Sequence, residues 1–345
     1  TEVARANFTG PPGFAAAADV ERPDAAGLTA EDFLITVEPN LLRSGTNILA
    51  IQLLNAHEFA ERILVLPNLT ATFKPGGLLS FMSPTPGTNN AEGFVGVAAT
   101  PDFSIPGGTF AGSLAVELTA ESTDTEIRYT TNRGLPTMSS LLYTDPIAIS
   151  TTTQIRAMAF RPGYVPSEIR TETYIPLGAD LANYENSDAP FSSQVPIVVF
   201  DTFGQSIVDD GIFRDISFTL YEPDGGVASF ANSATIKSRA GLKIRGSLTA
   251  GFPKKPYALE LRHDFSNTDR SLSLLGMPAE SDWVLQGPYD FDRSMNRNRI
   301  IYDLSNQIGR PAMRTRYIEV FVNQSGSQLT NSHYAGVYVL SLIHI

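Results

Sequence analysis

Two alternating segments in the C-terminal half of the chain decide how that half folds. The first is Gly241-Leu242-Lys243-Ile244-Arg245, and the second is Tyr257-Ala258-Leu259-Glu260-Leu261-Arg262. Apolar and polar side chains alternate in both, which is the period of a β-strand with one buried face. We therefore expect the two segments to pair as strands across residues 246–256.

The clearest helical pattern follows. Its apolar positions recur at three and four residues, namely Ile300, Ile301, Leu304 and Ile308. Asp292 can cap the beginning of the helix, and Gly309 followed by Pro311 ends it. Residues 317–322 and 336–340 are predicted to form a hairpin, and Trp283 is expected in the core.

The composition excludes several classes of protein. Hydrophobic residues make up 42% of the 345, so the chain can bury a core and is not wholly disordered. Lys and Arg number 25 against 36 Asp and Glu, and the net charge of −11 argues against non-specific nucleic-acid binding and a polybasic membrane anchor. No apolar run reaches the roughly 18 residues that a membrane span needs. Cysteine is absent, which excludes disulfides and thiolate sites, and the four scattered histidines argue against a histidine-rich metal site.

Five motifs of the C-terminal half together resemble the CotH kinase-like family. They are Ala240-Gly241-Leu242-Lys243-Ile244-Arg245-Gly246, Pro253-Lys254-Lys255-Pro256-Tyr257, Trp283-Val284-Leu285, Asp292-Arg293-Ser294-Met295-Asn296-Arg297-Asn298 and Tyr334-Ala335-Gly336-Val337-Tyr338-Val339-Leu340. The family consists of atypical secreted or spore-coat protein kinases. The resemblance implies ATP and Mg²⁺ as cofactors in the intact protein, and phosphorylation of Ser or Thr in a partner protein.

Phosphoryl transfer needs cations over the phosphates. Arg245, Lys254 and Lys255 lie in or beside the turn between the two alternating segments, where Gly246 and Gly251 would let backbone N–H groups approach phosphate oxygens. Lys255 is the candidate phosphate lysine, with Arg245 in support. The alternative for the lysine pair is a solvated strand end.

Three further candidates for nucleotide binding are Arg293, Arg297 and Asn298. The arginines are four residues apart, which predicts one shared helix face. The structural alternatives are a solvated face for the arginines, pairing with Asp292 or Asp303, and a satisfied polar group for Asn298. Asp290 and Asp292 are interpreted as turn and cap residues rather than metal ligands.

Two resemblances cover the N-terminal half. Glu126-Ile127-Arg128-Tyr129-Thr130-Thr131, Pro136-Thr137, Tyr143-Thr144-Asp145-Pro146-Ile147 and Thr152-Thr153-Gln154-Ile155-Arg156-Ala157 look like the chitobiase C-terminal β-module. The sequence departs from that module at the turn Asn132-Arg133-Gly134-Leu135, where the family usually has Asp-Gly-Ser. Ser44-Gly45-Thr46-Asn47-Ile48-Leu49-Ala50-Ile51-Gln52 resembles the end of a galactose-binding-like jelly roll.

The fold class is therefore predicted to be mainly β and multidomain. A jelly-roll fragment and an Ig-like β-sandwich precede an incomplete α+β kinase-like domain. The expected boundaries are 1–74 for the jelly roll, 75–93 for a linker, 94–176 for the Ig-like module, 177–194 for a second linker and 195–340 for the kinase-like part. Residues 341–345 are interpreted as a non-native tail.

The family's metal-binding and catalytic carboxylates lie beyond the Gly336-Val337-Tyr338 strand. No catalytic or metal residue is therefore assigned in this chain, and we expect it to be inactive as a kinase by itself, with an unpaired strand edge. The predicted protein is secreted or at the cell surface, with a protein substrate or a surface glycan as partner. The alternatives are a non-catalytic adhesion or scaffold protein and, more weakly, a carbohydrate-binding assembly.

Overall fold

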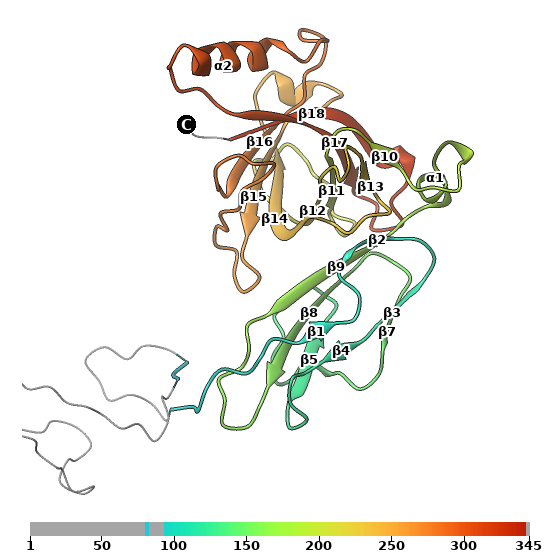
Figure 1. The fold of residues 1–345 in the computed structure, drawn as a ribbon, viewed down its shortest axis with the longest axis vertical. Coiled ribbons are helices and arrows are strands. Elements are labelled where there is room, and N and C mark those ends of the chain that lie inside the picture. Colours follow the sequence, from blue (N-terminus) through green and yellow to red (C-terminus); the bar gives the residue numbers. More distant parts are fainter. Residues whose placement is uncertain (1–79, 83–92, 343–345) are drawn as a thin grey trace, which may run out of the picture. The chain divides into compact units, whose positions relative to one another are not determined.

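The structure, a computed structural model, describes residues 80–82 and 93–342. The predicted jelly-roll fragment 1–74 and most of the predicted linker 75–93 lie outside the described residues. The described part contains a small β-module and a β-barrel that belong to one compact unit (Figure 1). The mainly-β fold class is confirmed.

The two alternating segments form neighbouring strands, as predicted. Strand β14 (Ile236–Ile244) pairs antiparallel with β15 (Tyr257–Arg262), with Ile244 opposite Tyr257. The apolar members of the alternation, Leu242 and Leu259 among them, are buried inside the barrel. The period of two thus places one face of each strand in the core.

Seven strands close into the barrel. Their order around it is β11 (Ile197–Asp201), β12 (Arg214–Tyr221), β14, β15, β16 (Asp282–Gln286), β18 (Tyr334–Leu342) and β17 (Thr315–Asn323). The predicted hairpin is confirmed as β17 and β18, which pair antiparallel. Parallel pairing of β11 with β17 completes the ring.

The expected unpaired edge is absent from this barrel. Strand β18 lies between β16 and β17, so both of its sides are hydrogen-bonded. Closure removes the edges that an open sheet would expose. Ser341 and Leu342 complete β18 and are buried, whereas residues 343–345 lie outside the described residues. The non-native origin of 341–345 stays a prediction.

The β-module precedes the barrel. Its larger sheet has the order β2 (Gly108–Phe110), β9 (Arg170–Pro176), β8 (Thr153–Phe160), β5 (Glu126–Thr130) and β6 (Leu141–Leu142). Two further pairs are β3 (Leu114–Val116) with β7 (Ile147–Ile149), and β1 (Asp102–Phe103) with β4 (Leu118–Thr119). Ile127 and Ile155 of the larger sheet pack with Val116 and Ile149, so the module has its own core.

The interpretation of 177–194 as a linker is wrong. This segment contains α1 (Ala179–Ala182) and β10 (Ser192–Ser193), which pairs with β13 (Ala228–Ser229). Leu181 and Phe191 are buried, and the ring of Phe191 lies 5.2 Å from that of Phe321. Both side chains belong to a second hydrophobic core, which lies between the end of the module and the outer face of β11 and β17. The polar composition of the segment did not reveal this packing.

Hydrogen bonds also join the module to the barrel. The Thr109 backbone N–H donates to the buried Tyr221 hydroxyl at 2.7 Å, and the two hydroxyls lie 2.9 Å apart. Tyr221→Phe leaves the Thr109 N–H without this acceptor, so we expect a loss of about 1–3 kcal/mol in the free energy of unfolding. Urea denaturation measures it. Tyr289→Phe, on an exposed residue, is the control, and equal midpoints for the two variants would contradict the prediction.

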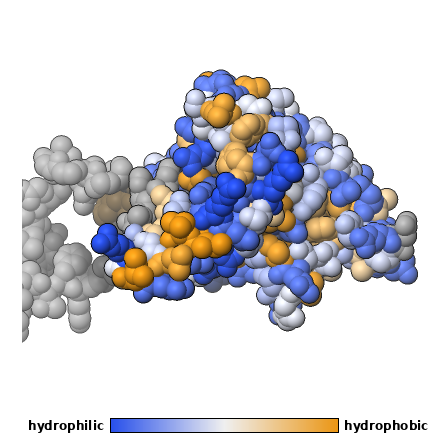
Figure 2. Space-filling model, turned by 90° about the horizontal axis from the view of Figure 1, so that it is seen from above, coloured by the Kyte–Doolittle hydropathy of each residue, from blue (hydrophilic) through white to orange (hydrophobic). Residues whose placement is uncertain are grey.

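The predicted helix exists as α2 (Arg297–Gln307) and begins later than Asp292. The Asp292 carboxylate still accepts a hydrogen bond from the Arg297 backbone N–H at 3.3 Å. None of the helix's residues is buried among the described residues, and the apolar stripe is between 50% and 72% exposed. Figure 2, which views the molecule from the α2 side, shows apolar side chains gathered on this surface.

Candidate functional site

The loop 245–256, which joins β14 to β15, carries three of the predicted cations. Its base is closed by the Arg245 backbone N–H, which donates to the Pro256 carbonyl at 3.1 Å. Gly246 has a φ of 93°, and a Cβ there would come within 2.2 Å of Thr249 Oγ1. Only glycine fits this turn without strain, so the local sequence fixes the loop's shape.

Lys254 lies against strand β18. Its Nζ donates to the Val337 carbonyl at 2.5 Å and lies 4.9 Å from the centre of the Tyr338 ring. Partial burial lowers the pKa of Lys254, and the charge of Glu319 acts in the opposite direction. The ammonium group is thus held at one end of the barrel.

Lys255 is anchored within the loop itself. Its Nζ donates to the Ala250 carbonyl at 2.7 Å, and its own carbonyl accepts a hydrogen bond from the Tyr338 hydroxyl at 2.9 Å. A Cβ on Gly287, just after β16, would come within 3.2 Å of the Lys255 carbonyl oxygen. An ammonium has three donors, and the described residues use one on each lysine.

Arg245 differs from the two lysines because its side chain is exposed. Within residues 80–82 and 93–342 its guanidinium makes no hydrogen bond or ion pair. Of the three loop cations, it is therefore the one most open to an incoming anion.

The prediction of a shared helix face for Arg293 and Arg297 is wrong. Arg293 precedes α2, and the chain between the two leaves helical geometry at Met295, which has a φ of 56°. The exposed Arg293 forms an ion pair with Asp290, whereas the structural alternative had named Asp292 or Asp303 as the partner. Arg297 is exposed at the start of the helix.

Asn298 is connected to the region of the loop 245–256 through one residue, Gln286. Its Nδ2 donates to Gln286 Oε1 at 2.9 Å, and Gln286 Nε2 donates to Ser341 Oγ at 3.4 Å. Gln286 is followed by Gly287, which lies against Lys254 and Lys255. The structure therefore brings Asn298 and the two lysines to the same end of β16, and it ties Asn298 to a structural partner.

The site offers cations and backbone amides but few carboxylates. In the described ranges, no group of three His, Asp or Glu side chains is arranged to hold a metal ion. Asp292 is buried and accepts hydrogen bonds from Ser294 Oγ and from the Arg297 N–H. Cations of this kind can pair with phosphate oxygens. Asp290 lies in a turn, as predicted, but the N-cap of α2 is Asn296, and Asp292 contacts the helix by accepting a hydrogen bond from the Arg297 N–H.

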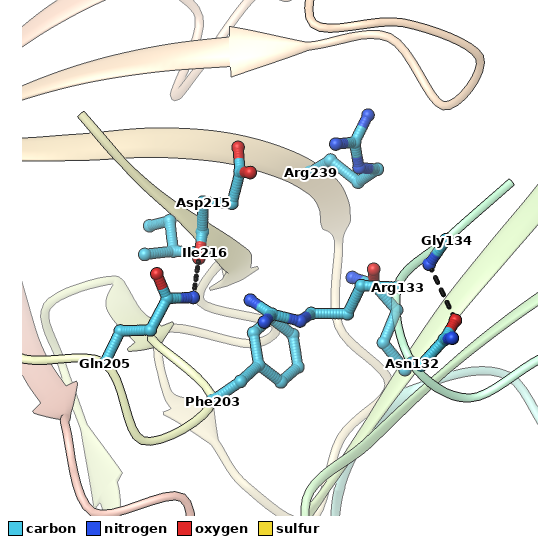
Figure 3. A pocket seen from close by; sticks show the side chains of 9 residues that line it. Asn132, Arg133, Gly134, Phe203, Gln205, Asp215, Ile216 and Arg239 are labelled. Carbon is cyan, nitrogen blue, oxygen red and sulfur yellow. Dashed lines mark hydrogen bonds between the residues drawn. The ribbon is translucent and has the colours of Figure 1, made fainter.

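One polar hollow was not predicted from the sequence. It lies where the β-module meets the barrel, and Arg133, Phe203 and Arg239 are among the residues around it (Figure 3). These residues come from separate segments of the chain, so no local spacing could have signalled them. Only the departure at the Asn132-Arg133-Gly134 turn pointed to this region.

The geometry first defines a class, a β-module followed by a closed barrel that carries a basic hairpin loop. Residues 242–341 match the family model described as CotH kinase protein, and residues 116–174 match the one described as Fn3 associated. The chain therefore carries a CotH-like segment preceded by an Fn3-associated β-module. The resemblance to the CotH kinase-like family is confirmed. No curated protein matches the chain. The described part has no helix of the length and apolarity needed to cross a membrane.

Proposed function

We propose that this chain carries the nucleotide phosphate-anchoring part of a CotH-type protein kinase that is secreted or held at the cell surface. The observation that supports the proposal is the gathering of Arg245, Lys254 and Lys255 on one hairpin loop inside the segment that matches the kinase family. A protein substrate, or a surface glycan or protein bound by the β-module, is the proposed partner.

The residues of the loop define how it would bind phosphate. Bound ATP with Mg²⁺ supplies the phosphoryl group to be transferred. Arg245 offers a planar fork of N–H donors, and the two lysines offer compact positive charges with unused donors. Positive charge that is already in place neutralises phosphate with little rearrangement. Gly246 lets the backbone approach the oxygens closely.

Lys255→Ala is expected to weaken ATP binding at least about tenfold, because one phosphate-facing charge is lost. Isothermal titration of the whole chain with Mg²⁺ and ATP at low salt measures the binding. Lys243→Ala is the matched control, since Lys243 belongs to the adjoining strand rather than to the loop, and its Nζ lies 4.3 Å from the Phe213 ring centre. Equal effects of the two substitutions would count against the proposal.

A non-catalytic scaffold is the second candidate. Its support is that Lys254 and Lys255 both donate to backbone carbonyls, which are structural roles. On this alternative, Lys255→Ala lowers thermal stability, and the wild-type chain does not bind ATP. The titration above therefore separates the two functions.

A further inference from the structure

A hollow of about 310 Å³ lies between the β-module and the barrel (Figure 3). On the module side, the turn after β5 and the start of β8 line it. On the barrel side, β12, β14 and the loop after β11 line it. The volume lies at the lower end of the range for small-molecule sites, which begins at about 300 Å³.

Backbone strain is concentrated at this hollow. Among the described residues, five non-glycine residues have a positive φ, and two of these five, Arg133 at 68° and Phe203 at 54°, line it. They also meet, because the guanidinium carbon of Arg133 lies 5.1 Å from the centre of the Phe203 ring. A left-handed conformation costs a non-glycine residue about 1–2 kcal/mol, and such residues cluster at functional sites. Arg133 thus occupies a position that glycine would fill without strain.

Of the two arginines around the hollow, Arg133 is the one whose guanidinium has no hydrogen-bond acceptor within residues 80–82 and 93–342. Asp215 Oδ1 accepts a hydrogen bond from Arg262 at 2.5 Å, and Arg239 donates to acceptors of its own in the loop 263–267. The Arg133 guanidinium has no acceptor among the residues that the structure describes. Two arginines and one aspartate give the lining a formal charge of +1, in a chain whose net charge is −11.

Two amide oxygens of the lining accept no hydrogen bond from the residues that the structure describes. Gln154 is almost fully buried and uses one of its two amide N–H donors on Thr173 Oγ1 at 3.1 Å, and its amide oxygen remains available to accept. Gln205 donates to the Asp215 carbonyl at 3.5 Å and likewise keeps its oxygen. Acceptors of this kind suit ligand hydroxyl groups, which donate.

We infer that this hollow binds a small hydroxycarboxylate of the uronic-acid type. The carboxylate pairs with the fork of Arg133, which the Phe203 ring holds in place. The hydroxyls donate to the amide oxygens of Gln154 and Gln205 and to the carboxylate of Asp215. A monoanion balances the charge of the lining, whereas a phosphate group with its charge of about −1.5 to −2 exceeds it. This site is separate from the loop 245–256, and the inference does not depend on the nucleotide binding proposed for that loop.

Titration of the whole chain with glucuronate tests the inference, with glucose as the neutral analogue of the same ring and inorganic phosphate as the competing anion. We expect saturable binding of glucuronate, at least about tenfold weaker binding of glucose, and the same loss in Arg133→Gln. Arg161→Gln is the matched control and should bind like the wild type. Arg161 belongs to the same module and its guanidinium carbon lies 4.2 Å from the Tyr164 ring centre, but it does not line the hollow.

Arg133→Gly separates binding from folding. Glycine adopts the φ of 68° without strain, so this variant should melt at or above the wild-type temperature while losing glucuronate binding. The inference is overturned if no saturable binding occurs, if Arg133→Gln binds glucuronate as the wild type does, if glucose binds equally well, or if phosphate binds more tightly than glucuronate.

Discussion

Trp283→Ala is expected to lower the free energy of unfolding by about 3–5 kcal/mol, because it empties the largest site in the barrel core. Trp283 is fully buried, and its Nε1–H donates to the Glu280 carbonyl at 3.0 Å. It stands opposite Leu259 on one side and Leu342 on the other, so its ring supports three neighbouring strands.

Urea denaturation followed by circular dichroism measures this loss, since the chain has one tryptophan and the variant removes its fluorescence. Trp283→Phe should lose less than Trp283→Ala, because it keeps most of the ring volume. Leu248→Ala is the surface control, since Leu248 is 81% exposed, and it should change stability by no more than about 0.5 kcal/mol. A Trp283→Ala midpoint equal to that of Leu248→Ala would show that the barrel core does not depend on this ring.

The strands next to Trp283 could be predicted from the sequence because their signal is local. Alternation at a period of two identified β14 and β15, and the same reasoning identified the β17–β18 hairpin. The closure of the barrel could not be predicted in this way. It depends on parallel pairing of β11 with β17, which lie far apart in the chain, and no turn motif records that contact.

Segment 177–194 shows a second limit of composition. Its polar residues predicted a linker, yet Leu181 and Phe191 supply enough apolar surface to hold it against the barrel. A few buried side chains decide whether a polar segment packs, because each one can contribute about 1.5–3 kcal/mol of apolar burial.

Of the two candidate sites, one could be predicted from the sequence and the other could not. The cations of the loop 245–256 could be predicted, since one hairpin carries Arg245, Lys254 and Lys255. The hollow at Arg133 could not be predicted. Neither a strained φ angle nor a contact between distant segments produces a recognisable spacing of residues in the sequence. The apolar stripe of α2 was predicted from its period, but its exposure among the described residues was not.

Asp201 is expected to make stability depend on pH. This carboxyl is fully buried at the end of β11 and accepts hydrogen bonds from the Phe203 N–H at 2.8 Å, from Thr152 Oγ1 at 3.2 Å and from Asn323 Nδ2 at 2.8 Å. Burial raises the pKa of Asp201 to about 6 from the ordinary 3.8, although these three hydrogen bonds act in the opposite direction. The folded state therefore binds a proton in a range where the unfolded state does not.

The sign of the effect follows from that difference. As the pH falls through about 6 toward about 4, protonation of the buried carboxyl stabilises the folded state, and the gain is complete below the unfolded pKa. A difference of this size corresponds to at most about 3 kcal/mol. The lowered pKa of His333, which burial causes, acts the other way over part of this range. Comparison of the wild type with Asp201→Asn cancels that contribution.

The measurement is urea denaturation of both proteins at several pH values between about 7.5 and 4.5. The wild type should gain stability relative to Asp201→Asn as the pH falls. The substitution also turns an amide toward Asn323 Nδ2, but that change shifts the curve equally at every pH and leaves the slope as the readout. Asp124→Asn is the control, because hydrogen bonds from Ser122 and Arg161 lower the pKa of the exposed Asp124, so its stabilisation is lost only at more acidic pH. Parallel curves for the wild type and Asp201→Asn would show that Asp201 does not titrate in this range.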